Sequence, residues 1–150
     1  MIKEKINLSK ETSGGLWLKG IYKSRDLNHP LVTIITTTFN SSKTLKETLK
    51  SIFDQEYDNI ELIIIDAGSN DDTIEIIKNY EDKIDYWLSE SDNGIYDGFN
   101  KGLSLAKGDY IGFVNSDDVL RNNALSILVK YHRKYPKIDF VFGSVEKHWG

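Results

Sequence analysis

The 150-residue chain contains no cysteine, which excludes disulfides and thiolate metal sites, so any metal must be held by oxygen or histidine. No apolar run reaches the roughly 20 residues that a membrane-spanning helix needs, and the N-terminus has no signal-peptide core. Basic residues are not in excess: the net charge is -4, which argues against binding nucleic acid by neutralising its phosphates. These absences predict a cytoplasmic protein that does not bind nucleic acid.

What is present divides into an N-terminal extension, residues 1–30, and one domain, residues 31–150. The extension mixes polar residues with aromatic ones, and we expect it to dock through its aromatics or to pair with another copy. The remainder is large enough to bury a core. The composition of the whole chain, with 39% apolar and 28% charged residues, is typical of a globular protein.

From residue 31 onward, runs of β-branched residues alternate with apolar residues at helical spacing. Strands are predicted at 31–39, 60–66, 84–88, the start of 110–118, and 138–143, with helices between them. The strand that opens 110–118 has the continuous apolar pattern of a strand buried on both faces. The third helix is predicted to have one inward face that carries Ile95, Phe99, Gly102, Leu103 and Ala106, and Ser69 with Asp72 fits a capping box for the second. This alternation predicts an α/β fold of three layers (α/β/α), with a mainly parallel sheet.

Ligands bind such sheets outside the carboxyl ends of the strands. The three strand exits, 38–40, 66–69 and 115–118, are all polar, and two of them are acidic. None carries the glycine pattern of a dinucleotide-binding turn or of a P-loop, which argues against both kinds of site. The exits are therefore the candidate site for another kind of ligand.

Asp117 and Asp118 follow a buried strand directly, where two neighbouring carboxylates repel each other unless a cation lies against them. Oxygen ligands suit Mg²⁺ or Mn²⁺. The alternative for this pair, taken alone, is a solvated loop that caps the next helix.

Four stretches in order resemble signatures of the family 2 glycosyltransferases, whose fold is called GT-A, a Rossmann-like nucleotide-diphospho-sugar transferase fold. Residues 36–40 (TTTFN) resemble the exit of the first strand, and 65–73 (IDAGSNDDT) resemble the D-[DG]-G-S-x-D-x-T turn. Residues 89–102 (SESDNGIYDGFNKG) resemble the S-E-x-D-x-G-I-Y-D-A-x-N-K-G block of one subgroup. Residues 115–118 (NSDD) resemble the D-x-D metal motif.

The resemblance implies that Asp117 is the metal ligand and Asp118 its helper, with Mn²⁺ or Mg²⁺ as the cofactor. Asn115 replaces the first acidic residue of the D-x-D motif. Asp66 is expected to accept a hydrogen bond from uracil, and Phe39 to lie beside the base. The residues that the resemblance assigns to binding of the nucleotide and the donor sugar are Thr37, Thr38, Phe39, Asn40, Asp66, Gly68, Asp92, Tyr96, Asp97, Asn100, Lys101, Asn115 and Ser116.

Two further readings concern single side chains. Tyr96 and Asn100 are helical neighbours that can point into one cleft, and Lys101 could offset diphosphate charge. Asp71 and Asp72 are interpreted as helix caps rather than ligands.

The implied function is a metal-dependent, inverting glycosyltransferase of the hexosyl- or N-acetylhexosaminyl-transferring type, with a UDP-sugar donor and a cell-surface polysaccharide or lipid-linked glycan as acceptor. Such an enzyme needs a general base, which the resemblance places well past the metal motif. The chain extends only about thirty residues beyond Asp118, so we expect the acceptor half to be missing. Glu146 and His148 are the late candidates, and the sequence favours neither.

The alternative function is a non-catalytic nucleotide-sugar-binding module that acts through self-association or a partner. A homo-oligomer, peripheral membrane association and a location at the inner face of the membrane are further hypotheses. The sugar, the acceptor, the linkage and the general base are not specified by these motifs.

Overall fold

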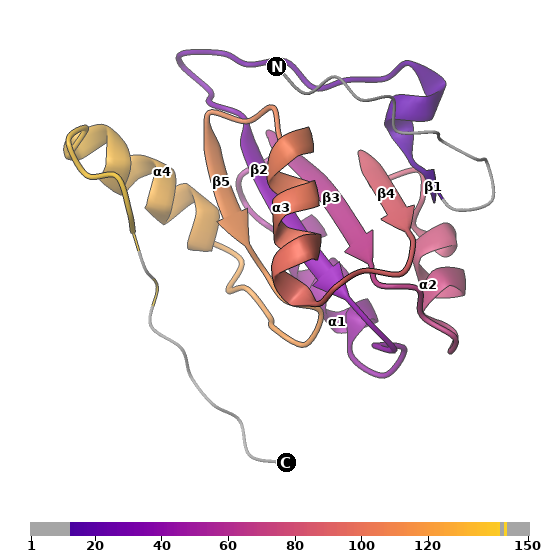
Figure 1. Cartoon of the computed structure of the whole chain (residues 1–150). Helices are drawn as coiled ribbons and strands as arrows, with labels where there is room; N and C mark the ends of the chain where they lie inside the picture. The colour runs from indigo at the N-terminus through magenta and orange to yellow at the C-terminus, as the bar shows by residue number, and fades with distance from the viewer. Residues whose placement is uncertain (1–12, 142, 144–150) are drawn as a thin grey trace.

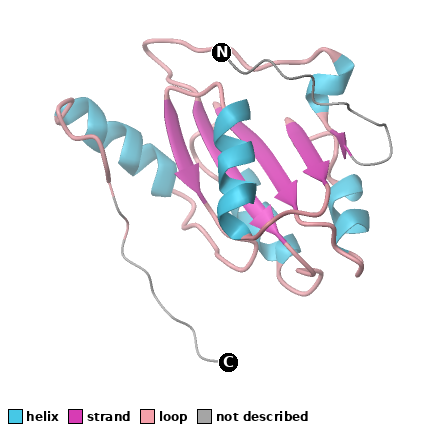
Figure 2. Cartoon of the chain, in the orientation of Figure 1, coloured by secondary structure: helices cyan, strands magenta, loops and turns pink. Residues whose placement is uncertain are grey.

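A computed structural model describes residues 13–141 and 143. These residues form a five-stranded sheet in the order β1-β4-β3-β2-β5, in which β1 is antiparallel to β4 and the other pairs are parallel (Figures 1 and 2). The strands are β1 (Ser13–Gly14), β2 (Val32–Thr38), β3 (Ile60–Asp66), β4 (Tyr86–Ser89) and β5 (Tyr110–Phe113). The predicted α/β fold with a mainly parallel sheet is confirmed.

Helices cover both faces of this sheet (Figure 1). They are η1 (Leu16–Lys19), α1 (Leu45–Phe53), α2 (Thr73–Asn79), α3 (Ile95–Leu105) and α4 (Ala124–Lys134). One face packs against α3, and the other packs against α1 and α2, with α4 beside β5. The three layers follow from the βαβ alternation, because each crossover helix must bury its apolar stripe against the sheet.

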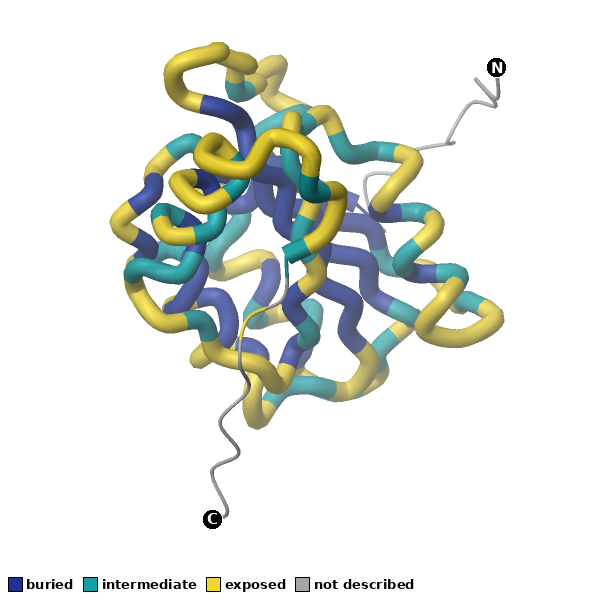
Figure 3. Tube along the Cα trace, turned by 90° about the vertical axis from the view of Figure 1, so that its left-hand side faces the viewer, coloured by how far each residue is buried: buried dark blue, intermediate teal, exposed yellow. Residues whose placement is uncertain are grey.

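The main core lies between the sheet and helices α1, α2 and α4. It combines alternate residues of β2 and β3, such as Ile34 and Leu62, with Leu49 of α1 and Leu125 of α4. All seven residues of β2 and all seven of β3 are buried, as expected for central parallel strands covered on both faces. Buried residues run through the centre of the molecule and exposed ones lie at its periphery (Figure 3).

Helix α3 approaches the sheet closely because its buried positions are glycines, Gly98 and Gly102. A Cβ atom on Gly102 would lie 2.4 Å from Cγ2 of Ile35, and one on Gly98 would lie 3.0 Å from Cγ2 of Thr37. The predicted inward face of this helix is therefore right at Gly102 and wrong at Ile95 and Leu103. Ile95 is 50% exposed and Leu103 is 42% exposed, because the helix packs through its small residues.

Strand β5 lies at an edge of the described sheet and pairs with β2 alone. The prediction that it is buried on both faces is wrong, since Ile111 is 45% and Phe113 is 48% exposed. A continuous apolar run does not reveal which strand stands at the edge. The predicted strand at 138–143 is not formed over its described residues 138–141, and residue 142 lies outside the described part of the chain.

The segment from residue 13 to residue 30 packs along β4 and the loop after α3. Trp17 stacks on Tyr86 with ring centroids 5.3 Å apart, and the Lys107 ammonium lies 3.7 Å from the Trp17 ring centroid. Lys23 forms an ion pair of 2.8 Å with the buried Asp85. These contacts join the segment to the sheet edge opposite β5.

Among the described residues, no helix combines the length and the apolar character that crossing a membrane requires.

Candidate functional site

The site lies at the edge of the sheet where β2, β3, β4 and β5 all end, the lower edge in Figure 1. Two hydrogen bonds join three of the strand exits. The Asn40 amide donates to Ser69 Oγ at 2.8 Å, which links the exits of β2 and β3. The hydroxyls of Ser41 and Ser116 lie 2.8 Å apart, which links the exits of β2 and β5. Segments distant in the sequence thus form one continuous rim.

Asn40 turns the chain sharply after β2. Its φ of 49° is in the left-handed region, which asparagine tolerates better than most residues. Its Oδ1 accepts a hydrogen bond of 3.0 Å from the Asn70 amide. The turn leaves Phe39 projecting from the rim, 59% exposed. The ring is therefore accessible to a planar ligand.

Thr37 and Thr38 are less accessible than the sequence suggests. Thr37 is 9% exposed and Thr38 is 4% exposed, because strand β2 is central and α3 covers the side of Thr37. Of the predicted first-strand group, only Phe39 and Asn40 are exposed at the rim.

Asp66 is fully buried at the end of β3, with 0% exposure. Its Oδ2 accepts hydrogen bonds from the amides of Gly68 (3.0 Å) and Ser69 (2.8 Å) and from the Ser89 hydroxyl (2.7 Å). Its Oδ1 accepts one from the Ser69 hydroxyl. Both carboxylate oxygens are directed at protein donors, whereas the sequence led us to expect one of them to face a base.

The turn after β3 depends on Gly68, whose φ of 78° is left-handed. A Cβ there would lie 3.4 Å from the Ser91 amide nitrogen, in the loop that follows β4. Gly68 thus contributes backbone shape to the site.

Helix α2 begins differently from the prediction. Asp72 occupies the N-cap position but makes no side-chain capping hydrogen bond, and the Ser69 hydroxyl is committed to Asp66. The predicted capping box is therefore wrong. Asp71 instead accepts from the amide and the hydroxyl of Thr73 and from the Ser42 amide. The hydrogen bond from Thr73 is the main reason that the pKa of Asp71 lies well below its usual range, and partial burial opposes it.

The loop before α3 and its first turns hold the predicted sugar-side group. Oδ1 of Asp92 accepts a hydrogen bond of 2.9 Å from the Gly94 amide. Its Oδ2 lies 3.5 Å from the position that a Cβ on Gly98 would take, on the side of α3 that faces the sheet. Tyr96, 79% exposed, and Asn100, also exposed, lie on the side of α3 away from Gly98 and Gly102. They share a face as predicted, but that face is open surface in the described part of the chain.

Lys101 is not free to meet a diphosphate. Its ammonium is 2.9 Å from Glu90 and 3.1 Å from Asp97. Burial lowers the pKa of Lys101, but the hydrogen bonds to Glu90 and Asp97 outweigh it and raise that pKa. The hydrogen bond from Lys101 lowers the pKa of Asp97. This cluster joins the β4 exit to α3.

The loop after β5 presents Asp117 and Asp118, both exposed. The side-chain Nδ2 of Asn115 donates a hydrogen bond of 3.2 Å to Oδ2 of Asp118. The buried Oδ1 of Asn115 has no hydrogen-bond partner. Within the part of the chain that is described, no group of three or more histidine, aspartate or glutamate residues could hold a metal. The loop suits a cation that takes its other ligands from a bound phosphate and water, as Mg²⁺ commonly does.

Sequence reasoning missed the serines that join these loops, Ser41, Ser69 and Ser89. Two of them stand inside the quoted motifs, but a small hydroxyl residue in a turn is usually interpreted as turn chemistry. The catalytic candidates Glu146 and His148 lie outside the described residues.

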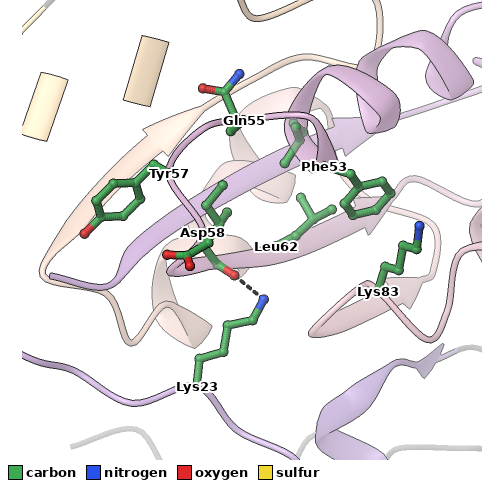
Figure 4. Close-up of a pocket in the computed structure, with 9 residues that line it drawn as sticks. Lys23, Phe53, Gln55, Tyr57, Asp58, Leu62 and Lys83 are labelled. Carbon is green, nitrogen blue, oxygen red and sulfur yellow. Dashed lines mark hydrogen bonds between the residues drawn. The ribbon is translucent and has the colours of Figure 1, made fainter. Parts of the chain in front are cut away.

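A hollow of about 300 Å³ opens away from this rim, where β3 begins (Figure 4). It is lined by Phe53, Leu62 and Lys83 among others, and Lys23 reaches its edge to donate to the carbonyl oxygen of Ile60. It lies at the opposite end of the strands from the polar exits, so we do not assign the site to it.

Comparison with known proteins identifies the family of the chain. The model of the family "Glycosyl transferase family 2" matches residues 33–149. An uncharacterised glycosyltransferase of Haemophilus influenzae is 41% identical over 102 residues, 66% of this chain and 41% of that protein. The GalNAc(5)-diNAcBac-PP-undecaprenol beta-1,3-glucosyltransferase of Campylobacter jejuni is 34% identical over 105 residues, 67% of this chain and 34% of that protein.

Solved structures are similar in fold. Residues 1–349 of S. aureus TarS, in complex with UDP-GlcNAc, align at a TM-score of 0.65 with 25% identity, over 71% of this chain and 32% of that one. The mannosyltransferase PcManGT of Pyrobaculum calidifontis, in complex with GDP-Man and Mn²⁺, aligns at a TM-score of 0.65 with 23% identity, over 77% of this chain and 36% of that one.

The fold and the rim define an α/β protein of the GT-A class. The chain belongs to glycosyl transferase family 2. It spans 41% and 34% of the length of the two curated relatives named above.

Proposed function

We propose that this chain forms the donor-binding part of a metal-dependent, inverting glycosyltransferase that uses a UDP-sugar. The observation that carries the proposal is the joining of the β2, β3 and β5 exits through Asn40–Ser69 and Ser41–Ser116. A parallel sheet binds its ligand at such exits. The UDP-GlcNAc complex of the TarS relative supports a uridine nucleotide. The GDP-Man complex of PcManGT makes guanosine the competitor to test.

The exposed residues of the rim receive the ligand-facing roles. Phe39 stacks beside the base, and Tyr96 and Asn100 are the exposed polar groups of α3 that can reach the sugar. Lys101 is bound by Glu90 and Asp97, so we assign it to holding the loop before α3 rather than to the diphosphate.

Asp117 and Asp118 would hold the cation, and the hydrogen bond from the Asn115 side chain would orient the Asp118 carboxylate. When bound, a divalent cation supplies Lewis-acid neutralisation of the charge that develops on the leaving diphosphate. The PcManGT complex supports Mn²⁺. In the transfer, the acceptor oxygen bonds to the anomeric carbon from the side opposite the diphosphate, whose bond to that carbon breaks, and the acceptor proton passes to a general base.

The acceptor class is proposed from a relative. The Campylobacter glucosyltransferase is named for a polyprenyl-diphosphate-linked glycan, which supports a lipid-linked glycan as acceptor here. A cell-surface polysaccharide is the other acceptor of the same chemistry.

Calorimetric titration tests the donor and metal roles together. We expect UDP to bind at least tenfold more tightly with Mn²⁺ than without, equal to about 1.4 kcal/mol, and more tightly than GDP. Asp117→Asn should remove the Mn²⁺-dependent part, whereas Asp82→Asn, the same change at an exposed aspartate outside the rim, should not. UDP binding that is absent or indifferent to Mn²⁺ would contradict the proposal.

Transfer of labelled sugar from a UDP-sugar to a lipid-linked oligosaccharide separates an enzyme from a binding module. Transfer that is lost in Asp117→Asn supports the enzyme. Tight UDP binding without hydrolysis or transfer supports the non-catalytic module.

A further inference from the structure

We infer that Asp66 is a positioning residue, whose carboxylate holds the exits of β2, β3 and β4 in one arrangement so that they form the base-binding side of the rim. This inference rests on the proposed nucleotide-binding function for its purpose. It differs from the expectation that Asp66 itself accepts a hydrogen bond from the base.

The position of Asp66 in the sheet makes such a role possible. Strand β3 is central, and Asp66 is its last residue, paired with Thr38 of β2 on one side and with Ser89 of β4 on the other. Its backbone carbonyl accepts from the Glu90 amide at 3.1 Å. Three chain segments therefore leave the sheet around one residue.

All four partners of the carboxylate are donors. Two are amides and two are hydroxyls, and they come from the β3 exit (Gly68 and Ser69) and from the β4 exit (Ser89). An ionised carboxylate only accepts hydrogen bonds and has about four lone-pair sites for them. The donor set therefore matches a carboxylate, and hydrogen bonds to a charged group are the stronger kind.

The Ser69 hydroxyl extends this arrangement to the β2 exit. It accepts a hydrogen bond from the Asn40 amide at 2.8 Å, so its own proton is the one directed at Asp66 Oδ1. Asn40 is held in a left-handed conformation directly after the exposed Phe39. Asp66 thereby determines where Phe39 projects, although the two side chains are not in direct hydrogen-bond contact.

Burial separates this role from direct recognition of the base. Asp66 has 0% exposure, and a base would have to displace Ser69 or Ser89 to reach either oxygen. Uracil carries a donor at N3 and cytosine an acceptor. A direct contact would therefore make Asp66 the source of a preference for UDP over CDP, whereas a positioning role affects both nucleotides alike.

The experiment compares the full chain with Asp66→Asn, Ser69→Ala and the control Asp72→Asn. The control makes the same charge change at an exposed aspartate without a side-chain capping bond. Ser69→Ala breaks the link to Asn40 while it leaves Asp66 in place, so the test does not depend on Asp66→Asn folding as well as the wild type. Amide hydrogen exchange without nucleotide is measured first, followed by UDP and CDP affinities.

We expect Asp66→Asn and Ser69→Ala each to speed exchange at the Asn40 amide about tenfold. Asp66→Asn weakens the charged hydrogen bond that holds the Ser69 hydroxyl, and Ser69→Ala removes the acceptor of the Asn40 amide itself. UDP and CDP should weaken by the same factor, with their ratio unchanged, and Asp72→Asn should match the wild type. An unchanged Asn40 exchange rate in both variants would overturn the inference. A UDP-to-CDP ratio that changes only in Asp66→Asn would overturn it in favour of direct recognition. If the wild type binds neither nucleotide, the proposed function fails, and the positioning role is still decided by the exchange rates.

Discussion

Single side chains, more than helices or strands, connect the loops of this site. Asp71 receives hydrogen bonds from Thr73 at the start of α2 and from Ser42 after β2, and Asp66 receives four from two exits. Asp66 is the last residue of β3 and Asp71 lies in the loop that follows, positions at which a sequence pattern is usually interpreted as a turn or a cap. The burial of Asp66 and the partners of both residues distinguish them from ordinary turn residues.

The lowered pKa of Asp71 predicts a pH-dependent contribution to stability. In the unfolded chain an aspartate has a pKa of about 3.9. In the folded protein the hydrogen bonds from Thr73 and Ser42 hold the pKa of Asp71 well below that value. The stabilisation is thus complete above the unfolded-state pKa and is lost as the pH falls through the range between the two.

Urea unfolding of the wild type and Asp71→Asn tests this linkage. We expect the wild type to be the more stable at pH 7 and pH 5, and the difference to shrink as the pH drops below about 4. A difference in unfolding free energy that is the same at pH 7 and pH 3 would contradict it.

At the scale of elements, the packing of α3 on β2 and β3 places the first turns of this helix beside the rim. Gly98 and Gly102 allow that approach. Their spacing of four residues puts them on one face, and glycine in a helix interior otherwise costs stability relative to alanine. The close approach compensates for that cost.

Gly102→Ala should therefore destabilise the protein, although alanine favours helices. The new methyl would lie 2.4 Å from Ile35 Cγ2, and overpacking of this kind costs about 1–3 kcal/mol. Chemical denaturation measures the loss. Ser104→Ala, at an exposed position of the same helix, should change the unfolding free energy by less than about 0.5 kcal/mol. Equal stability of Gly102→Ala and wild type would mean that α3 lies farther from the sheet.

At the scale of the whole molecule, residues 13–30 connect parts that the central sheet leaves apart. Trp17 lies between Tyr86 of β4 and Lys107 after α3, and Arg25 forms an ion pair with Asp109 before β5. The segment thus runs along the edge of the sheet opposite the rim and contacts both ends of the strand order.

Trp17→Ala should lower the unfolding free energy by about 1–3 kcal/mol, because it removes a stacked aromatic pair and a cation–π contact from a partly buried site. Leu27→Ala is the matched control, since Leu27 is 97% exposed in the same segment and its truncation should have little effect. Thermal unfolding followed by circular dichroism compares the three proteins. A loss in Leu27→Ala as large as that in Trp17→Ala would show that the segment acts through its backbone rather than through this ring.

The sequence by itself determined the succession of strands and helices along the chain and the identity of the residues that end each strand. Predicted strands at 31–39 and 60–66 correspond to β2 and β3 within a residue at each end. Apolar periodicity and turn residues act over a few positions, so a linear pattern contains them. The motifs at 36–40, 65–73, 89–102 and 115–118 likewise placed the chain in its family.

Only the tertiary structure decided which strand is at the edge, which face of α3 is buried, and what Asp66 holds. Ser89 reaches Asp66 across 23 residues, and Asn40 reaches Ser69 across 29. Such contacts depend on the order of the strands in the sheet, which leaves no periodic pattern in the sequence. For that reason the same carboxylate that the motif presents as a ligand is, in the folded chain, a buried acceptor surrounded by four protein donors.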